Sequence, residues 1–208
     1  MSSCFSLLAI CLPALCMQAQ PPSGQWQAMF DGKTLNGWKE TPFGGHGTVK
    51  IEDGTIILSP GAGAMTGITW TGPFPKQHYE VRLEATRLQG NDFFAGITFP
   101  VLNNFCSWIN GGWNGAVVGL SSLDGYDASE NETSTRFKFE KGRWYKLRLR
   151  VTDEQIAAWI DDELVVDFGV GTRQIDLRPG EIELSKPFGI AAFRTQAGLR
   201  NIQYRVLP

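Results

Sequence analysis

A stretch in the middle of the chain, NFCSWINGGWNG over residues 104–115, has residue types that bind sugars. Trp108 and Trp113 offer flat apolar rings that stack on the C–H faces of a sugar, and amides such as that of Asn110 pair with its hydroxyl groups. We therefore predict that Trp108, Asn110 and Trp113 contact a carbohydrate ligand or substrate. The alternative is that both tryptophans belong to the hydrophobic core.

The segment Glu80-x-Arg82-x-Glu84 places charged side chains at every second position, on one face of a predicted strand. Paired carboxylates cleave glycosidic bonds when the carboxyl groups are about 5 to 9.5 Å apart. Strand positions i and i+4 lie about 13 Å apart at Cα, so Glu80 and Glu84 do not suit that role. Two interpretations stay open: a charge-paired sheet face, or a sugar contact from Glu80 or Arg82.

A few other side chains could take part in acid–base chemistry. His46, in the glycine-rich stretch GGHGT, and His78 are the two histidines, so a histidine base would be one of them. His46 is better placed at the rim of a site. Arg194 could stabilise an anionic oxygen or form a structural salt bridge. Two histidines without ligand spacing do not indicate a zinc site.

Four acids crowd one short segment: Asp124, Asp127, Glu130 and Glu132. Their oxygen atoms could hold a divalent cation such as Ca²⁺, although their spacing follows no known calcium loop. The alternative is a solvated acidic loop. The sequence indicates no other cofactor, no defined set of metal ligands and no particular oligomeric state.

The charge balance argues against a nucleic-acid partner. The 208 residues include 19 basic and 21 acidic side chains, which leaves a formal charge of −2. Proteins that bind nucleic acid usually present a basic face. The length is typical of one domain, which can bury a sufficient core without disulfides or metals.

The first residues predict a targeting segment. Residues 5–17, FSLLAICLPALCM, form an apolar run that is too short to span a bilayer and fits the centre of a signal peptide. We expect a signal peptide over residues 1–19, a short linker over 20–27, and export to the periplasm or extracellular space. No later apolar run is long enough to cross a membrane. Cys106, the only cysteine left in the mature chain, is predicted to be a small buried residue.

The remaining chain, residues 28–208, is predicted to be all-β. Apolar and charged residues alternate over Tyr79–Ala85 and Trp144–Thr152, and Asp53-Gly54 and Asp161-Asp162 are typical of turns between strands. Further strands are expected at Thr48–Glu52, Thr55–Ser59, Phe93–Phe99, Ala116–Ser121, Ser134–Phe139, Ile156–Ile160, Leu164–Phe168, Glu181–Ser185, Phe188–Arg194 and Ile202–Val206. So many strands without a helix indicate two packed antiparallel sheets. A concave sheet with polar outward residues would then be a natural face for a sugar.

Several segments carry a family resemblance. Residues 29–38, MFDGKTLNGW, resemble the FDGKTLxGW opening of the 3-keto-disaccharide hydrolase domain family. HYEVRLEATRL over 78–88 and LRNIQYRVL over 199–207 are similar to later strands of that family, in the same order. The resemblance covers almost the whole mature chain. It implies a concanavalin A-like jelly-roll sandwich, export, and action on oxidised glycosides.

The chemistry that the resemblance implies starts from a sugar with a ketone at C3. The ketone acidifies the C2 hydrogen, so that a base removes it, the C1 substituent leaves and water adds. Such a site needs a base and a cation or donor facing the enolate oxygen. The candidates are His46, Arg194 and Asp124, which is the acid that remains of the family's E-x-Q-x-x-D strand.

Departures from the family pattern leave the function open. Pro100, Gly119 and Ser121 stand at polar positions of the family. The chain is therefore either an enzyme acting on 3-keto-glycosides or a lectin-like module without catalysis. A third alternative is an interaction domain of a cell-surface assembly.

Overall fold

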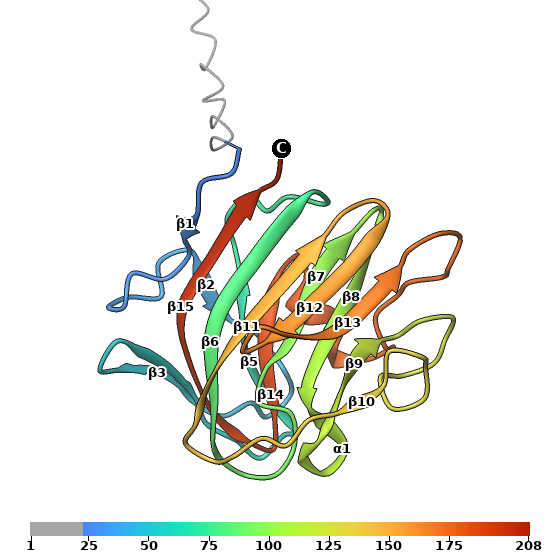
Figure 1. Ribbon diagram of the computed structural model, residues 1–208. Helices are drawn as coiled ribbons and strands as arrows, with labels where there is room; N and C mark the ends of the chain where they lie inside the picture. Colours follow the sequence, from blue (N-terminus) through green and yellow to red (C-terminus); the bar gives the residue numbers. More distant parts are fainter. Residues whose placement is uncertain (1–22) are drawn as a thin grey trace, which may run out of the picture.

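The computed structural model describes residues 23–208, which form two antiparallel β-sheets packed face to face (Figure 1). The predicted signal peptide over residues 1–19 lies outside the described residues, as do residues 20–22 of the predicted linker. Within the part that the structure describes, no helix has the length and apolar character needed to cross a membrane.

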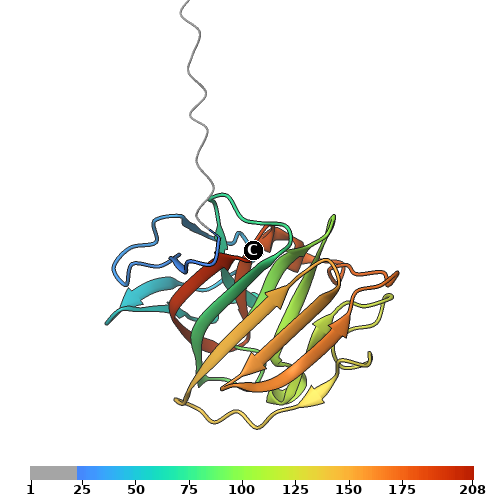
Figure 2. The same ribbon diagram turned by 45° about the horizontal axis from the view of Figure 1, so that its top comes forward.

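The first sheet has eight strands and contains the longest ones. Its order is β13 (Glu163–Gly169), β12 (Gln155–Ile160), β11 (Trp144–Val151), β6 (Tyr79–Gln89), β15 (Gln196–Val206), β4 (Thr55–Leu58) and β3 (Val49–Glu52), and β1 (Gln27–Ala28) also pairs with β15. In Figure 2 the neighbouring strands β6, β11, β12 and β13 run side by side in front of the other sheet.

The second sheet has seven strands and lies behind the first in Figure 1. Its order is β10 (Thr135–Arg136), β9 (Val117–Ser121), β8 (Asn104–Gly111), β7 (Gly96–Val101), β14 (Gly189–Phe193), β5 (Met65–Trp70) and β2 (Trp38–Glu40). Two short helical segments complete the fold, α1 (Gly112–Gly115) and the 3₁₀ helix η1 (Glu181–Ser185). This architecture confirms the predicted all-β, jelly-roll sandwich.

Apolar side chains at every second strand position fill the space between the sheets. On β11, Tyr145, Leu147, Leu149 and Val151 are buried, and the charged residues between them point away from the core. The two predicted turns also form. Asp53 and Gly54 have φ angles of 47° and 74°, which is the left-handed geometry of a tight hairpin turn, and Asp161 and Asp162 repeat it at 47° and 71°.

Several segments differ from the prediction at the level of secondary structure, and the strands β2 and β5 were not predicted. Glu181–Ser185 is the helix η1 instead of a strand, because only its last residue is buried and its apolar side chains do not reach the core. Asn104–Gly111, whose two asparagines and final glycine are typical of a loop, is the strand β8 and pairs with both β7 and β9.

The predicted linker also differs, because its described end belongs to the sandwich. Gln27 pairs with Tyr204 of β15, and the ring of Trp26 lies 4.1 Å from the guanidinium carbon of Arg82. The domain therefore begins a few residues before position 28.

A buried carboxylate connects three strands of the eight-stranded sheet. Glu80 on β6 is 2 % exposed, and its Oε2 accepts a hydrogen bond of 2.8 Å from Nε of Arg205 on β15. Nη1 of Arg148 on β11 approaches Oε1 at 3.4 Å. A charge that is buried must be paired, so this cluster has a structural role and Glu80 is not available to a ligand. The prediction that Glu80 contacts a sugar is wrong for this reason.

Replacing Glu80 by Gln tests that structural role. The variant leaves two guanidinium groups beside a neutral amide, and since both arginines are partly exposed we expect a loss of about 2 kcal/mol in the free energy of unfolding. Urea unfolding measures it, with Glu163→Gln on the exposed start of β13 as the matched control. Equal stability of the two variants would contradict the structural role.

Candidate functional site

A cleft of about 270 Å³ lies on the outer face of the seven-stranded sheet. Ser107, Ile109 and Ser121 of β8 and β9 are among the residues that line it from the sheet, and residues 178–182 line it from the loop that leads into η1. Phe93, Phe193 and Trp113 supply its aromatic lining. We call this hollow the aromatic cleft.

The backbone presents Trp113 at this cleft instead of burying it. Trp113 is 36 % exposed and occupies the turn α1, where its φ of 46° lies in the left-handed region that a bulky residue rarely adopts. Strain of this kind persists only where the surroundings impose it, and it is common at binding sites.

A buried arginine holds the turn that carries Trp113. Nη1 of Arg87 donates to the carbonyl of Gly115 at 3.1 Å, and its Nη2 donates to that of Phe139 at 2.8 Å. Burial lowers the pKa of Arg87 from its ordinary value. A Cβ atom at Gly115 would lie 2.6 Å from Nη1 of Arg87, so only glycine fits there. Arg87 therefore positions the tryptophan without touching the cleft.

The apolar wall of the cleft is fixed by a backbone contact. The N–H of Phe193 donates to the carbonyl of Phe93 at 2.9 Å, and the two ring centroids are 5.6 Å apart. The rings therefore form one continuous surface beside Trp113, which also lines the cleft.

Two charged groups of opposite sign reach the cleft from one loop. Nη1 of Arg178 lies 3.2 Å from Oδ2 of Asp127, whose Oδ1 accepts the hydroxyl of Ser121 at 3.0 Å. Glu181 accepts the N–H of Gly44 on its Oε1 at 2.7 Å. The cleft thus combines an apolar surface, a hydroxyl, a guanidinium and a carboxylate, a set that suits a polar molecule with one apolar face.

Two of the predicted sugar contacts lie inside the protein. Trp108 and Asn110 are 0 % exposed, and Nδ2 of Asn110 donates to the carbonyl of Ala95 at 2.9 Å. The reason is the alternation along β8, which turns Trp108 and Asn110 toward the core and Ser107 and Ile109 toward the cleft. The prediction that Trp108 and Asn110 contact a ligand is therefore wrong. Trp113 escapes the alternation because it lies beyond the end of the strand.

The three predicted catalytic residues are not brought together at this cleft. His46 bonds through Nδ1 to the carbonyl of Gly47 at 2.8 Å, and Arg194 occupies the turn between β14 and β15. Asp124 is engaged elsewhere. The N–H of Gln174 and the guanidinium of Arg173 hold the pKa of its carboxyl below the ordinary value. His46, Asp124 and Arg194 do not line the cleft, so the structure does not support a shared catalytic role for them.

Arginines pair with three of the four acids that the sequence offers as ligands for Ca²⁺. Asp124 and Glu132 both bind Arg173, and Asp127 binds Arg178. Over residues 23–208, no three side chains of His, Cys, Asp or Glu gather as a metal site would require.

The sequence reasoning missed Phe93, Arg178, Glu181 and Phe193. Arg178 and Glu181 flank Pro179-Gly180, which is visible as a turn but gives no indication of what it faces. Phe193 stands in the predicted strand Phe188–Arg194. Sequence alone could not show that this position lies beside Phe93 and Trp113.

Comparisons with known proteins agree with this fold. No curated protein matches the chain. A laminarinase from Flavobacterium sp. UMI-01 has a TM-score of 0.57 at 14 % identity, over 90 % of this chain and 100 % of that one. A Parabacteroides distasonis protein described as a glycosyl hydrolase has a TM-score of 0.57 at 13 % identity, over 88 % and 94 % of the two chains. The carbohydrate-binding module CBM66 from Bacillus subtilis has 0.50 at 14 %, over 81 % and 95 %.

Identities this low show a shared fold and nothing finer. The family comparison goes further, because its match runs from residue 25 to residue 204 and so includes both sheets and the aromatic cleft. The chain belongs to the family of the 3-keto-alpha-glucoside-1,2-lyase-like domain.

Proposed function

We propose that this protein is an exported carbohydrate-active domain that takes a sugar ring into the aromatic cleft. The observation that carries the proposal is Trp113, a partly exposed ring on a strained turn beside a hydroxyl and two charged groups. A volume of about 270 Å³ suits one sugar ring better than a long chain. The hydrolase and carbohydrate-binding names of the structural neighbours support the same ligand class.

The reaction that the cleft supports best is cleavage of a 3-keto-glycoside. Glu181 is the group placed to remove the C2 hydrogen, because Oε1 is fixed by Gly44 and the carboxylate also lines the cleft. Arg178 is the cation that would face the enolate oxygen at C3. The electron pair then forms the C1–C2 double bond as the C1–O bond breaks, the leaving oxygen takes a proton, and water adds.

A second function, binding without catalysis, is supported by the departures from the family pattern. Pro100, Gly119 and Ser121 replace polar residues of the family, and His46, Asp124 and Arg194 do not meet at the cleft. Under this alternative the same ring and the same charged pair hold the sugar without transforming it.

Truncating Trp113 to Ala tests the ligand site. If the ring stacks on a sugar, the free energy of sugar binding becomes about 1–3 kcal/mol less favourable in the variant. The melting temperature changes little because the ring is partly exposed. Calorimetric titration of the 3-keto-disaccharide measures the affinity. Trp144→Ala, a half-buried tryptophan of the opposite sheet that does not line the cleft, is the matched control and should keep it. A collapsed melting transition in Trp113→Ala would make the ring part of the core and refute the assignment.

Replacing Glu181 by Gln tests the catalytic role. We expect turnover of the 3-keto-disaccharide, followed as release of free sugar, to fall about 100-fold or more with little change in binding. Glu183→Gln, in the same short helix but outside the cleft, is the control and should keep full turnover. A wild-type protein that binds the sugar without turning it over would establish the second function. Absence of both activities would refute the proposal.

A further inference from the structure

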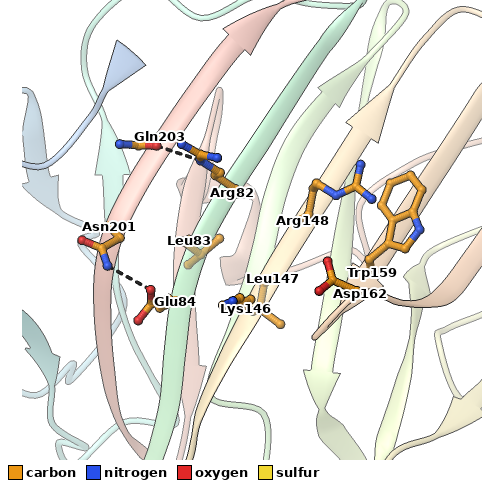
Figure 3. A pocket seen from close by; sticks show the side chains of 10 residues that line it. All are labelled: Arg82, Leu83, Glu84, Lys146, Leu147, Arg148, Trp159, Asp162, Asn201 and Gln203. Atoms are coloured by element: carbon orange, nitrogen blue, oxygen red, sulfur yellow. Dashed lines mark hydrogen bonds between the residues drawn. The ribbon is translucent and has the colours of Figure 1, made fainter. Parts of the chain in front are cut away.

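A second and larger hollow, of about 520 Å³, lies on the opposite face of the molecule. Figure 3 shows the side chains that line it. The hollow opens on the outer face of the eight-stranded sheet, over strands β15, β6, β11 and β12. We call it the arginine hollow, after Arg82 and Arg148, which line it together with Lys146 and Trp159. The proposed function makes no use of this face.

One row of side chains across these strands carries an unusual charge pattern. The register places Gln203 of β15 opposite Arg82, Arg82 opposite Arg148 of β11, and Arg148 opposite Trp159 of β12. Like charges directly opposite each other in a sheet are destabilising. In Figure 3 the two guanidinium groups lean apart, Arg82 toward Gln203 and Arg148 toward Trp159, and the hollow opens between them.

The carboxylates nearby neutralise this row only in part, because Oε1 of Glu80 lies 3.4 Å from Nη1 of Arg148 while its Oε2 binds Arg205, and Arg82 has no such partner among the described residues. Burial acts to raise the pKa of Glu84, but hydrogen bonds from Arg200 and Asn201 outweigh it and hold the pKa below the ordinary value. Glu84 is therefore ionised and already paired with the guanidinium of Arg200. Among residues 23–208, no carboxylate oxygen lies within 4.0 Å of a charged nitrogen of Arg82 or Lys146.

Aromatic rings hold the arginines in place. The guanidinium carbon of Arg148 lies 3.7 Å from the centroid of the Trp159 ring, and that of Arg82 lies 4.1 Å from Trp26. Nε of Arg82 donates to Oε1 of Gln203 at 2.8 Å, and its two Nη atoms have no hydrogen-bond partner among the described residues. These donors are fixed in position before any ligand arrives, which reduces the entropic cost of binding an anion.

We propose that the arginine hollow binds an acidic sugar, with the carboxylate of a uronate between Arg82 and Arg148. A guanidinium group presents parallel N–H donors that match the two oxygens of a carboxylate, and Lys146 adds a third positive charge. Asn201, Gln203 and Asp162 also line the hollow and supply partners for hydroxyl groups. Nucleic acid is the poorer match, because guanidinium groups cover the rings of Trp26 and Trp159 on which bases would stack.

The test compares two ligands that differ only in charge. Short oligomers of galacturonate, glucuronate and mannuronate are titrated into the full-length protein by calorimetry, each beside its neutral methyl ester. We expect at least one acidic oligomer to bind, its methyl ester to bind at least ten-fold more weakly, and added salt to weaken the binding. Arg82→Gln and Arg148→Gln should each lower the affinity at least ten-fold.

Two control variants separate this site from other sources of charge and from the aromatic cleft. Arg136→Gln removes the same charge from an exposed position on β10 of the other sheet and should keep the affinity. Trp113→Ala should also keep it, so a failure of the proposed function and a failure of this inference give different results.

Several outcomes would overturn the inference: no binding of any uronate, equal binding of acid and ester, an equal loss in Arg136→Gln, or tighter binding of single-stranded DNA or of a sulfated oligosaccharide. If Arg82→Gln or Arg148→Gln does not fold, thermal unfolding of the unmodified protein still distinguishes the outcomes. The acidic oligomer should then raise the melting temperature and the methyl ester should not.

Discussion

The alternation of side chains across each strand decides which residues of this protein can meet a ligand. Both sheets bury one face against the other, so a one-position change along a strand moves a side chain from solvent to core. On β8 this places Trp108 inside and Ile109 at the aromatic cleft. On β6 it turns Arg82 outward beside the buried Val81 and Leu83. Both hollows are thus consequences of the same packing constraint.

Much of the fold could be predicted because its signals are local. Apolar and charged side chains alternate with period two over Tyr79–Ala85 and Trp144–Thr152. Asp53-Gly54 and Asp161-Asp162 form tight turns because Asp and Gly tolerate a positive φ. Strand β8 was not predicted because its two asparagines and its glycine are typical of a loop, and only its pairing with β7 and β9 makes it a strand. The opposite error occurred at residues 181–185, which were predicted to be a strand but form a helix, since their apolar side chains do not reach the core.

The candidate site was less predictable because it depends on contacts between distant loops. Arg178 and Glu181 face a strand end more than fifty residues earlier, and Trp113 is exposed through a turn that Arg87 holds. The acids that looked reactive in sequence have arginine partners: Glu80 has Arg205, Asp124 has Arg173, and Glu84 has Arg200. A charged residue shows its type in sequence, but its availability depends on a partner that only the fold supplies.

One departure from the family pattern, Gly119, has a steric explanation in the loop that follows β9. A Cβ atom at Gly119 would lie 2.9 Å from the carbonyl oxygen of Ala128 and 3.2 Å from that of Thr133, so the family's glutamate cannot occupy this position. The loop that closes over Gly119 also carries Asp127, which bonds to Ser121 and to Arg178. A carboxylate therefore approaches this part of the sheet from the loop instead of from the strand. The loop that fills the space over Gly119 thus also carries Asp127, whose partner Arg178 lines the aromatic cleft.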